Sequence, residues 1–401
     1  MHQVECELVD SVMRPVEHAP VLSVMIPTFS RAEELTVAVE SIASQVQGPL
    51  LGKVEIIVTD NASGPDTAAA LKALAETYPF VNYRINAANM GAPFQIFGAP
   101  FHARGRFTWI FGDDDALAPG GLAPIVDILE REEPAFLSIN REVWNPGFDT
   151  LFAASKHDLP DKRFDSFLDL LTLFGFDQLT FLTSQIVATD LTREIEPHFY
   201  ISSGCRFAQL GLYIEAFHDR PAYYFSRPAV RHRWNPDAKE VHAANFLDLA
   251  TAVPAIVQRA ADEVGLEPGL FERIGGRRGV LGEAARPLTF VDNILENLWR
   301  SVAIGSIVAE EEWDRLQGFS RSWRPDRAEH LATVRQMHAT LSAALEHYKT
   351  LVAEFQRRAA QPARTQEEAD MLNSIATAAK TLEGELNDAR KMAFTMAGQF
   401  N

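Results

Sequence analysis

The chain has 401 residues, of which 47% are hydrophobic and 10% aromatic; this is ample for a buried core and excludes a disordered chain. A formal net charge of −17 excludes sequence-independent nucleic-acid binding, which needs a basic surface. Two distant cysteines, Cys6 and Cys205, exclude a disulfide framework. The first 20 residues lack the pattern of a signal peptide, and no apolar run approaches the roughly 20 residues that span a bilayer. We therefore expect a cytoplasmic protein.

The first part of the chain alternates short apolar runs with helical patterns. Residues 21–27 (VLSVMIP) predict a buried strand, and residues 30–44 predict a helix with Ser30 as its N-cap. Further strands are expected at 54–59, 81–85 and 107–111, with helices at 67–78 and before the last of these strands. Four strands separated by helices within about 90 residues indicate an α/β fold with a doubly wound, mostly parallel sheet.

The pattern changes along the rest of the chain. Another helix is expected at 120–132, and strands are expected at 135–140, 184–188 and 222–226. After residue 243 the periodicity is almost entirely helical. We therefore expect an α/β domain over 1–240 and a helical region over 241–325.

Residues 326–401 form a third part with its own pattern. Mostly apolar residues recur three and four apart in two runs, broken at Pro362: Leu331, Val334, His338, Leu341, Leu345, Tyr348, Val352 and Phe355, then Leu372, Ile375, Ala379, Leu382, Leu386 and Ala389. This spacing predicts two long helices folded as a hairpin. Packing on the chain's own body and an intermolecular coiled coil both fit the pattern, so we expect a role in oligomerisation or in docking a partner.

Polar segments follow three of the predicted strands, at 27–31, 60–61 and 112–115. The carboxyl ends of parallel strands meet at one edge of a sheet, so these segments should lie together. Three consecutive carboxylates, Asp113, Asp114 and Asp115, repel one another unless a cation neutralises them, and carboxylate oxygens suit Mg²⁺ or Mn²⁺. Such a cation stabilises a departing pyrophosphate. A solvated turn is the alternative, and the position directly after an apolar strand disfavours it.

Four segments together resemble glycosyltransferase family 2, inverting enzymes of the GT-A fold. The matching segments, in the family's order and spacing, are 24–31 (VMIPTFSR), 55–63 (EIIVTDNAS), the loop with Asn86, Asn89, Met90 and Gly91, and 109–115 (WIFGDDD). The Gly-Asp-Asp-Asp form of the last segment resembles that of one branch of the family, which includes abequosyltransferase-like enzymes of bacterial surface polysaccharides. The resemblance implies that residues 20–140 bind the nucleotide sugar and that residues 141–240 form the acceptor side.

The resemblance also implies roles for individual residues. The nucleotide-binding residues would be Pro27, Thr28, Phe29, Arg31, Asp60, Asn61, Asn89, Gly91 and Asp113. The metal register has two readings. The family places a Pro five residues after the last Asp of its motif, and Pro119 stands five after Asp114, which puts Gly112 where the first Asp usually stands; read literally, Asp113-Asp114-Asp115 is itself the motif. Asp114 and Asp115 would be the main metal ligands. His232 is a further candidate ligand, and its neighbours Arg231 and Arg233 are candidates for binding phosphate oxygens.

The acceptor side departs from the family's pattern. An inverting transferase needs a carboxylate base to deprotonate the acceptor hydroxyl. The family supplies it from an acidic pair, whereas the equivalent stretch here, 202–209 (SSGCRFAQ), has no acid. Glu215 and Asp177 are the two candidates.

The sequence thus predicts a metal-dependent glycosyltransferase, using Mn²⁺ or Mg²⁺ and a UDP-, CDP-, GDP- or dTDP-sugar. It would move a hexosyl or deoxyhexosyl group to a saccharide, lipid-linked or protein acceptor, in bacterial surface-glycan assembly and, with a lipid-linked acceptor, at the inner membrane. A catalytically weak, transferase-like binding or scaffold protein is one alternative. A nucleotidyltransferase is the other, although the Gly-rich basic loop of such enzymes is missing after the first strand.

Overall fold

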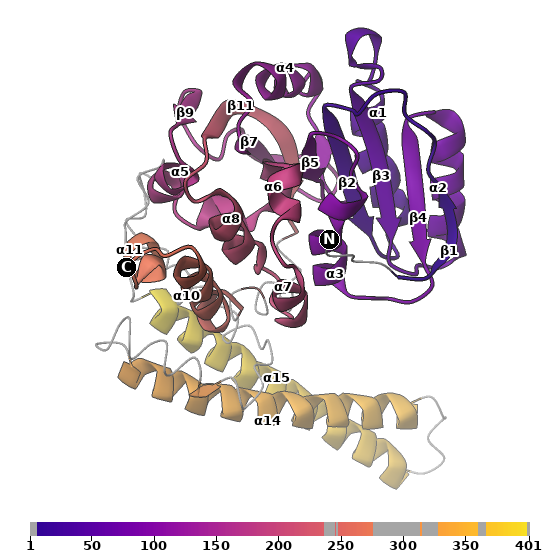
Figure 1. The fold of residues 1–401 in the computed structure, drawn as a ribbon. Coiled ribbons are helices and arrows are strands. Elements are labelled where there is room, and N and C mark those ends of the chain that lie inside the picture. The colour runs from indigo at the N-terminus through magenta and orange to yellow at the C-terminus, as the bar shows by residue number, and fades with distance from the viewer. Residues whose placement is uncertain are drawn as a thin grey trace. The chain divides into compact units, whose positions relative to one another are not determined.

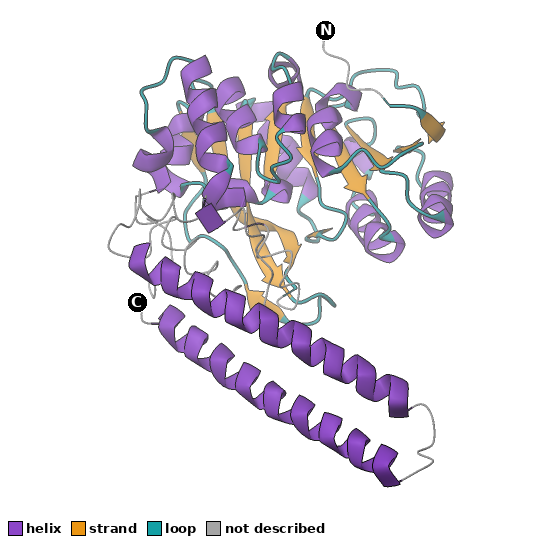
Figure 2. Cartoon of the chain, turned by 90° about the horizontal axis from the view of Figure 1, so that it is seen from below, coloured by secondary structure: helices purple, strands orange, loops and turns teal. Residues whose placement is uncertain are grey.

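The computed structural model of this protein describes residues 6–235, 245, 248–275, 313–314, 328–359 and 366–398. The chain divides into two compact units, one of residues Met1–Asn235 and Ala252–Phe290, the other of Pro236–Thr251 and Val291–Asn401. Figures 1 and 2 show the elements of both. Most of the predicted helical region over 241–325 lies outside the described residues, apart from α10 (Val253–Glu263) and α11 (Leu270–Gly275). The predicted domain boundaries therefore remain predictions.

One sheet organises the first unit. Its strands are β1 (Leu8–Val12), β2 (Leu22–Thr28), β3 (Val54–Asp60), β4 (Val81–Asn86), β5 (Phe107–Ile110), β6 (Ala116–Leu117), β7 (Phe136–Trp144), β8 (Leu151–Ala153), β9 (Lys162–Phe164), β10 (Gln185–Ala188) and β11 (Ala222–Arg233). Their order is β1-β4-β3-β2-β5-β10-β7-β11-β6, with β8 on β7 and β9 on β11.

The sheet is mixed, and its larger strands are parallel. The block β4-β3-β2-β5 is parallel throughout, and β11 is parallel to β7. Strand β10 joins the two blocks antiparallel to both, and β1 adds an antiparallel edge strand that the sequence did not predict. The α/β class and the four-stranded parallel core are confirmed.

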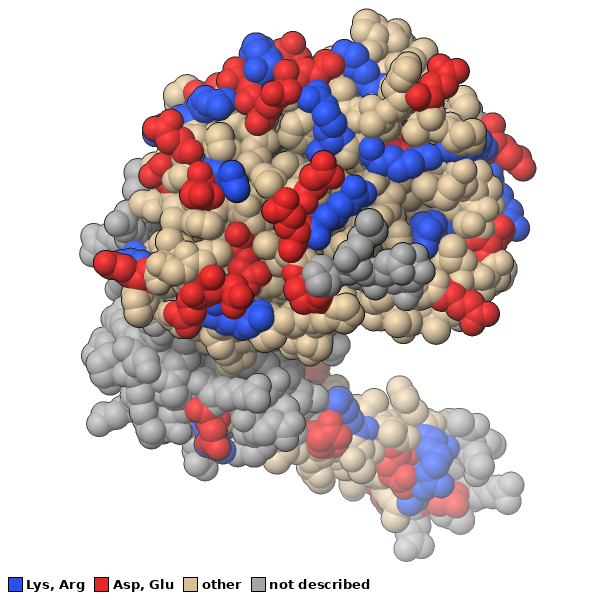
Figure 3. Space-filling view, viewed as in Figure 1, with Lys and Arg blue, Asp and Glu red and all other residues tan. Residues whose placement is uncertain are grey.

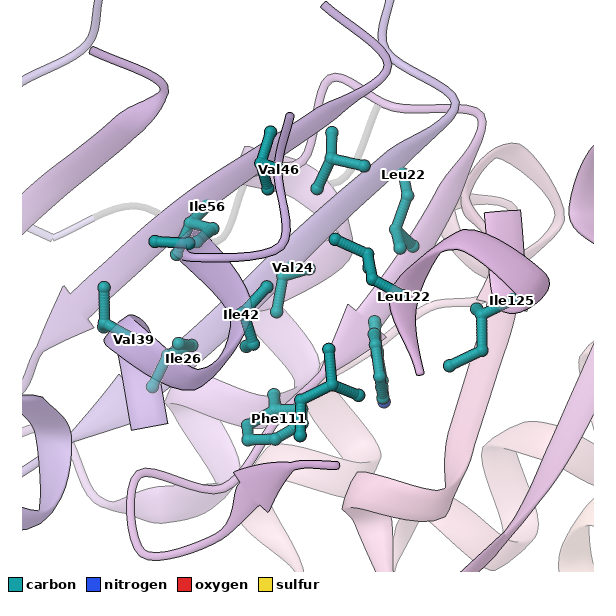
Figure 4. Close-up of a cluster of buried hydrophobic side chains, with 14 of the residues drawn as sticks. Leu22, Val24, Ile26, Val39, Ile42, Val46, Ile56, Phe111, Leu122 and Ile125 are labelled. Carbon is teal, nitrogen blue, oxygen red and sulfur yellow. The ribbon is translucent and has the colours of Figure 1, made fainter. Parts of the chain in front are cut away.

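Helices cover both faces of this sheet. They are α1 (Ala32–Ala43), α2 (Pro65–Thr77), α3 (Ala92–His102), α4 (Leu122–Glu132), α5 (Phe167–Phe174), α6 (Thr189–Arg193), α7 (His198–Ser202) and α8 (Gln209–Phe217), with short 3₁₀ turns η1 (Gly48–Leu50), η2 (Asp177–Thr180) and η3 (Leu182–Ser184). Side chains alternate along β2, so Val24 and Ile26 face the core beneath α1, α2 and α4, whereas Met25 faces α3. Figure 4 shows the first core, in which β2 meets Val39 and Ile42 of α1. With both faces covered, the loops at the carboxyl ends of the strands are left for a site.

The start of α1 differs from the prediction. Its N-cap is Arg31, which makes no capping hydrogen bond from its side chain. Ser30 has φ of 56° instead, and its backbone N–H donates to Ser63 Oγ at 2.7 Å. The predicted Ser30 cap is wrong because this residue is used to join two loops.

Strand β11 is longer than predicted. After an irregularity between Phe225 and Val230, its pairing with β7 resumes and continues to Arg233 opposite Trp144. The extension places the segment 231–233 within the sheet, beside the carboxyl end of β7.

The described part of the second unit is a pair of long helices, α14 (Ala328–Ala359) and α15 (Gln366–Gly398), which pack along each other. Both views show them side by side. Tyr348, Val352, Leu372 and Ile375 of the predicted apolar rows are half-buried, and Leu386 is buried. The predicted helical pair is confirmed, and a coiled coil with another chain stays a prediction. None of the described helices is long and apolar enough to cross a membrane.

Charged side chains of both signs are mixed on the surface. On the face shown in Figure 3, Lys and Arg lie among Asp and Glu, and the described residues of that face form no continuous basic area. This mixture of signs on the face shown agrees with the net charge of −17.

Candidate active site

The loops after β2, β3 and β5 meet at one edge of the sheet. The backbone N–H of Asn61 donates to the Thr28 carbonyl at 3.0 Å, which joins the first two loops. Thr28 Oγ1 donates to Asp113 Oδ2 at 2.8 Å, which joins the first loop to the third. The structure therefore brings together the three segments that the sequence placed at one edge.

Arg31 bridges two carboxylates of the aspartate run. Its Nη1 donates to Asp113 Oδ1 at 2.8 Å and to Asp114 Oδ2 at 3.0 Å. Asp113 is only 6% exposed, and this burial raises the pKa of its carboxyl group against the opposing effect of the Arg31 charge. Asp113 thus faces the loop after β2, whereas the side chain of Asp114 is 42% exposed.

Asp115 points the other way, into the protein. It accepts hydrogen bonds from Thr183 Oγ1 at 2.5 Å and from the backbone N–H of Arg233 at 3.0 Å. Burial, with the nearby charge of Asp114, raises the pKa of the Asp115 carboxyl well above its usual range. No local pattern pointed to Thr183, which lies 68 residues further along the chain.

Gly112 marks the point on which two carboxylates converge. A Cβ atom at Gly112 would lie 3.0 Å from Asp115 Oδ2, 3.1 Å from Asp114 Oδ1 and 3.1 Å from Thr183 Oγ1. A side chain at this position would therefore displace one of these groups. Glycine, which has no Cβ atom, avoids this crowding.

Among the described residues, no group of three or more Asp, Glu, His or Cys side chains is arranged to hold a metal ion. The ring of the candidate ligand His232 instead packs 4.2 Å from the ring of Phe181 and 6.0 Å from that of Trp234. The oxygens of Asp114 and Asp115 near Gly112 form a two-carboxylate set. Such a set fits a Mg²⁺- or Mn²⁺-type cation that takes its other ligands from phosphate oxygens and water.

The predicted nucleotide residues of the other two loops are linked by one side chain. Asn61 Nδ2 donates to Asn89 Oδ1 at 2.7 Å, and Asn61 Oδ1 accepts from the Met90 backbone N–H at 2.8 Å. Asn89 Oδ1 also accepts from the N–H of Gly91, whose φ of 83° favours glycine. The asparagine and glycine loop is therefore fastened to the end of β3.

Asp60 and Phe29 differ in exposure. Asp60 is fully buried, accepts hydrogen bonds from the Ser63 hydroxyl and backbone N–H, and has a pKa raised by burial. Phe29 is 48% exposed, and Pro27 beside it is half-buried. An exposed ring next to polar loops is suited to lie against a nucleotide base.

Residues 23–188 match the sequence model of the family described as glycosyl transferase family 2. The chain carries a glycosyl transferase family 2 domain. Over 122 residues the chain is 34% identical to the abequosyltransferase RfbV of Salmonella typhimurium. The aligned residues make up 30% of this chain and 36% of that protein. The resemblance seen in the sequence motifs is thereby confirmed.

Two solved structures are distantly similar to this chain. TarS of S. aureus (residues 1–349, in complex with UDP) has a TM-score of 0.44 and 15% identity, over 80% of this chain and 91% of that one. The mannosyltransferase PcManGT of Pyrobaculum calidifontis, in complex with GDP-Man and Mn²⁺, also has a TM-score of 0.44 and 15% identity. The match covers 83% of this chain and 90% of that one. Likenesses at these scores say nothing about the donor or metal of this chain.

The family 2 match ends at residue 188, yet the site draws on later residues. Arg233 supplies the backbone N–H to Asp115, and its guanidinium carbon lies 4.5 Å from the centre of the Phe148 ring. Arg231 lies over the ring of Trp144 at 5.2 Å, and its Nε is 3.3 Å from Glu142. The extension of β11 brings its backbone to the aspartate run, where Arg231 pairs with Ala116 of β6 and the Arg233 N–H reaches Asp115.

The two candidate bases lie in helical segments. Glu215 of α8 has a side chain only 8% exposed, 4.0 Å from Arg259 Nη1 of α10, and burial raises its pKa. The charged and polar groups that act on Glu215 are those of Tyr200, Arg259 and Glu263, which lie outside the aspartate run. Asp177 begins η2, and its side chain lies outside what the structure describes.

Proposed function

We propose that this protein is a metal-dependent, inverting glycosyltransferase that uses a nucleotide-sugar donor. The observation that supports this most is the meeting of three strand-end loops at Asp113, Asp114 and Asp115, with Thr28 and Arg31 bonded to the first two carboxylates. The loops supply, within one edge, polar groups for a nucleotide and two carboxylates for a cation. The donor is a UDP-, CDP-, GDP- or dTDP-sugar, and the acceptor a saccharide, lipid-linked group or protein.

Each residue has a defined part in this proposal. Phe29 and Pro27 lie against the base, Asp60 bonds the base or ribose, and the linked Asn61, Asn89 and Gly91 border the nucleotide. Asp113 faces the ribose, held by Thr28 and Arg31. Asp114 and Asp115 hold Mn²⁺ or Mg²⁺, which stabilises the charge on the departing diphosphate. Arg231 and Arg233 approach the diphosphate from the opposite side.

The base is the unassigned part of the reaction. Glu215 and Asp177 remain the candidates, and the recorded partners of Glu215 are helical residues outside the loops. The catalytically weak, transferase-like scaffold therefore remains the second candidate function. It would bind nucleotide sugars without turning them over.

Release of nucleoside diphosphate, coupled to a phosphatase, tests the proposal across a panel of UDP-, CDP-, GDP- and dTDP-sugars with Mn²⁺ or Mg²⁺. We expect one donor to be turned over, with activity lost on chelation and reduced at least about 100-fold in Asp114→Ala and Asp115→Ala. The control is Asp190→Ala, which changes a side chain 93% exposed on α6. Metal-dependent turnover unchanged in both site variants would contradict the assignment. Tight donor binding without turnover would favour the scaffold.

A further inference from the structure

A groove of about 760 Å³ adjoins the aspartate run, and of the residues given a part in donor binding only Arg231 and Arg233 line it. One wall is α1, which contributes Glu33, Val37 and Glu40. The opposite wall is formed by the turn between β7 and β8, with Phe148, and by Arg231 and Arg233 of β11. The volume is in the range of about 300–1,000 Å³ of small-ligand sites.

The groove borders the segment that directly follows the aspartate run. Ala116, which directly follows Asp115, lines the groove. Arg233 also lines it while its backbone N–H donates to Asp115 Oδ1 at 3.0 Å. Transfer requires donor and acceptor to meet beside the diphosphate. A groove that borders the end of the aspartate run is therefore placed to hold the acceptor.

The lining combines three kinds of chemistry. Carboxylates of α1 accept hydrogen bonds, the guanidinium groups of β11 donate them, and the Phe148 ring offers an apolar surface. A sugar ring has the matching features, since its hydroxyl edges donate and accept while its C–H face is apolar. An anionic ligand would be repelled by the α1 wall, and a purely apolar one would leave both charged walls without partners.

The turn that presents Phe148 is built for this placement. Phe148 has φ of 56°, which is an outlier for a bulky side chain. Its N–H donates to the Asn145 carbonyl at 3.1 Å, and Asn145 Oδ1 accepts the backbone N–H groups of Asp149 and Thr150, both at 3.1 Å. The ring also lies beneath the guanidinium of Arg233. The strained turn thus holds the ring of Phe148 against the groove that it lines.

We propose that this groove is the acceptor site and that the acceptor is a saccharide, with Phe148 stacking on a sugar ring and Glu33 binding its hydroxyls. The inference rests on the proposed function, because it assumes that a donor is held by the neighbouring loops. It selects one of the three acceptor classes that the sequence left open.

Saturation-transfer NMR tests the proposal on the full chain with Mg²⁺ and the nucleoside diphosphate that binds best. The probes are methyl glycosides of glucose, galactose, mannose, rhamnose and N-acetylglucosamine. We expect at least one to bind, with Kd weakened at least about tenfold in Phe148→Ala. Glu33→Gln keeps the shape of the side chain and should weaken binding about three- to tenfold. Nucleotide affinity should be unchanged in Glu33→Gln.

The matched control is Phe152→Ala, which removes a ring 52% exposed on β8 of the same hairpin but outside the groove. It should leave glycoside binding unchanged. Equal glycoside affinity in the wild type, Phe148→Ala and Glu33→Gln would overturn this inference alone. So would saturable binding of unglycosylated peptides with no glycoside bound. Absence of binding by any of the nucleotides would overturn the proposed function, and this inference with it.

Discussion

At the scale of single residues, the site depends on how three adjacent carboxylates are separated. Arg31 donates hydrogen bonds to Asp113 and Asp114, whereas the Thr183 hydroxyl and the Arg233 backbone N–H donate to Asp115. This division places the like charges in different surroundings and leaves Asp114 as the exposed member. An arrangement of this kind holds the run together before any cation binds.

His102, at the end of α3, should make stability fall in acid. Burial, with the charges of Arg84 and Arg193, lowers its pKa from 6.5 to about 4. Between pH 6.5 and about 4, the unfolded chain therefore binds a proton at this histidine and the folded chain does not. The free energy of unfolding should decrease as the pH falls through this range, by up to about 3 kcal/mol. Urea unfolding at pH 7 and pH 4.5 should show a smaller loss in His102→Gln than in the wild type. Equal losses in the two proteins would contradict the assignment.

At the scale of elements, a buried carboxylate ties together two strands and a loop. Glu55 of β3 is 2% exposed and accepts from Ser23 Oγ of β2 at 2.5 Å. It also accepts from the backbone N–H of Arg104 at 3.0 Å and from the Arg104 guanidinium, with Nε at 2.8 Å. This network fixes the loop between α3 and β5, and hence the strand that leads to the aspartate run.

Glu55→Gln should destabilise the folded chain by about 3 kcal/mol, because it leaves the guanidinium of Arg104 without its buried charge partner. Glu130→Gln is the matched control. It removes an exposed partner of Lys53, 2.7 Å away, and should cost less than about 1 kcal/mol. Chemical denaturation of both variants measures the difference. Similar losses in the two would show that the Glu55 network does not hold these elements.

Helix α8 should tolerate no side chain at Gly211, where it packs on α7 and α10. An added Cβ would lie 2.6 Å from Ile256 Cγ2 and 2.8 Å from Tyr200 Cε1. Gly211→Ala should therefore cost about 1–3 kcal/mol, despite the better helix propensity of alanine. At Gly384 of α15 nothing lies within 4 Å, so Gly384→Ala should be neutral or stabilising. Thermal unfolding should show a lowered midpoint temperature for Gly211→Ala and an unchanged or raised one for Gly384→Ala. A raised midpoint for Gly211→Ala would contradict the prediction.

At the scale of the whole molecule, the aspartate run and the α14–α15 pair belong to different compact units. The helical pair repeats apolar residues at coiled-coil spacing, and Met371 on it is 46% exposed. The chemistry and the association of the protein should therefore be separable.

A chain ending at residue 325 should lose self-association while keeping release of nucleoside diphosphate from the donor. The reason is that the loops of the site lie within the first unit, whereas the apolar rows are removed. Light scattering reports the molar mass, and the phosphatase-coupled assay reports turnover. An unchanged oligomeric state would contradict the oligomerisation role of these helices and leave docking of another partner as their role.

The sequence by itself determined the parallel strands, the loops that end them and the aspartate run, because apolar runs and turn residues are local signals. The tertiary structure decided the partners. Thr183 and Arg233 reach Asp115 from 68 and 118 residues away, through the pairing of β10 with β5 and of β11 with β7. The groove beside Phe148 likewise joins segments that no local pattern relates. Long-range register sets these contacts, and it depends on the packing of the whole sheet rather than on any one stretch of residues.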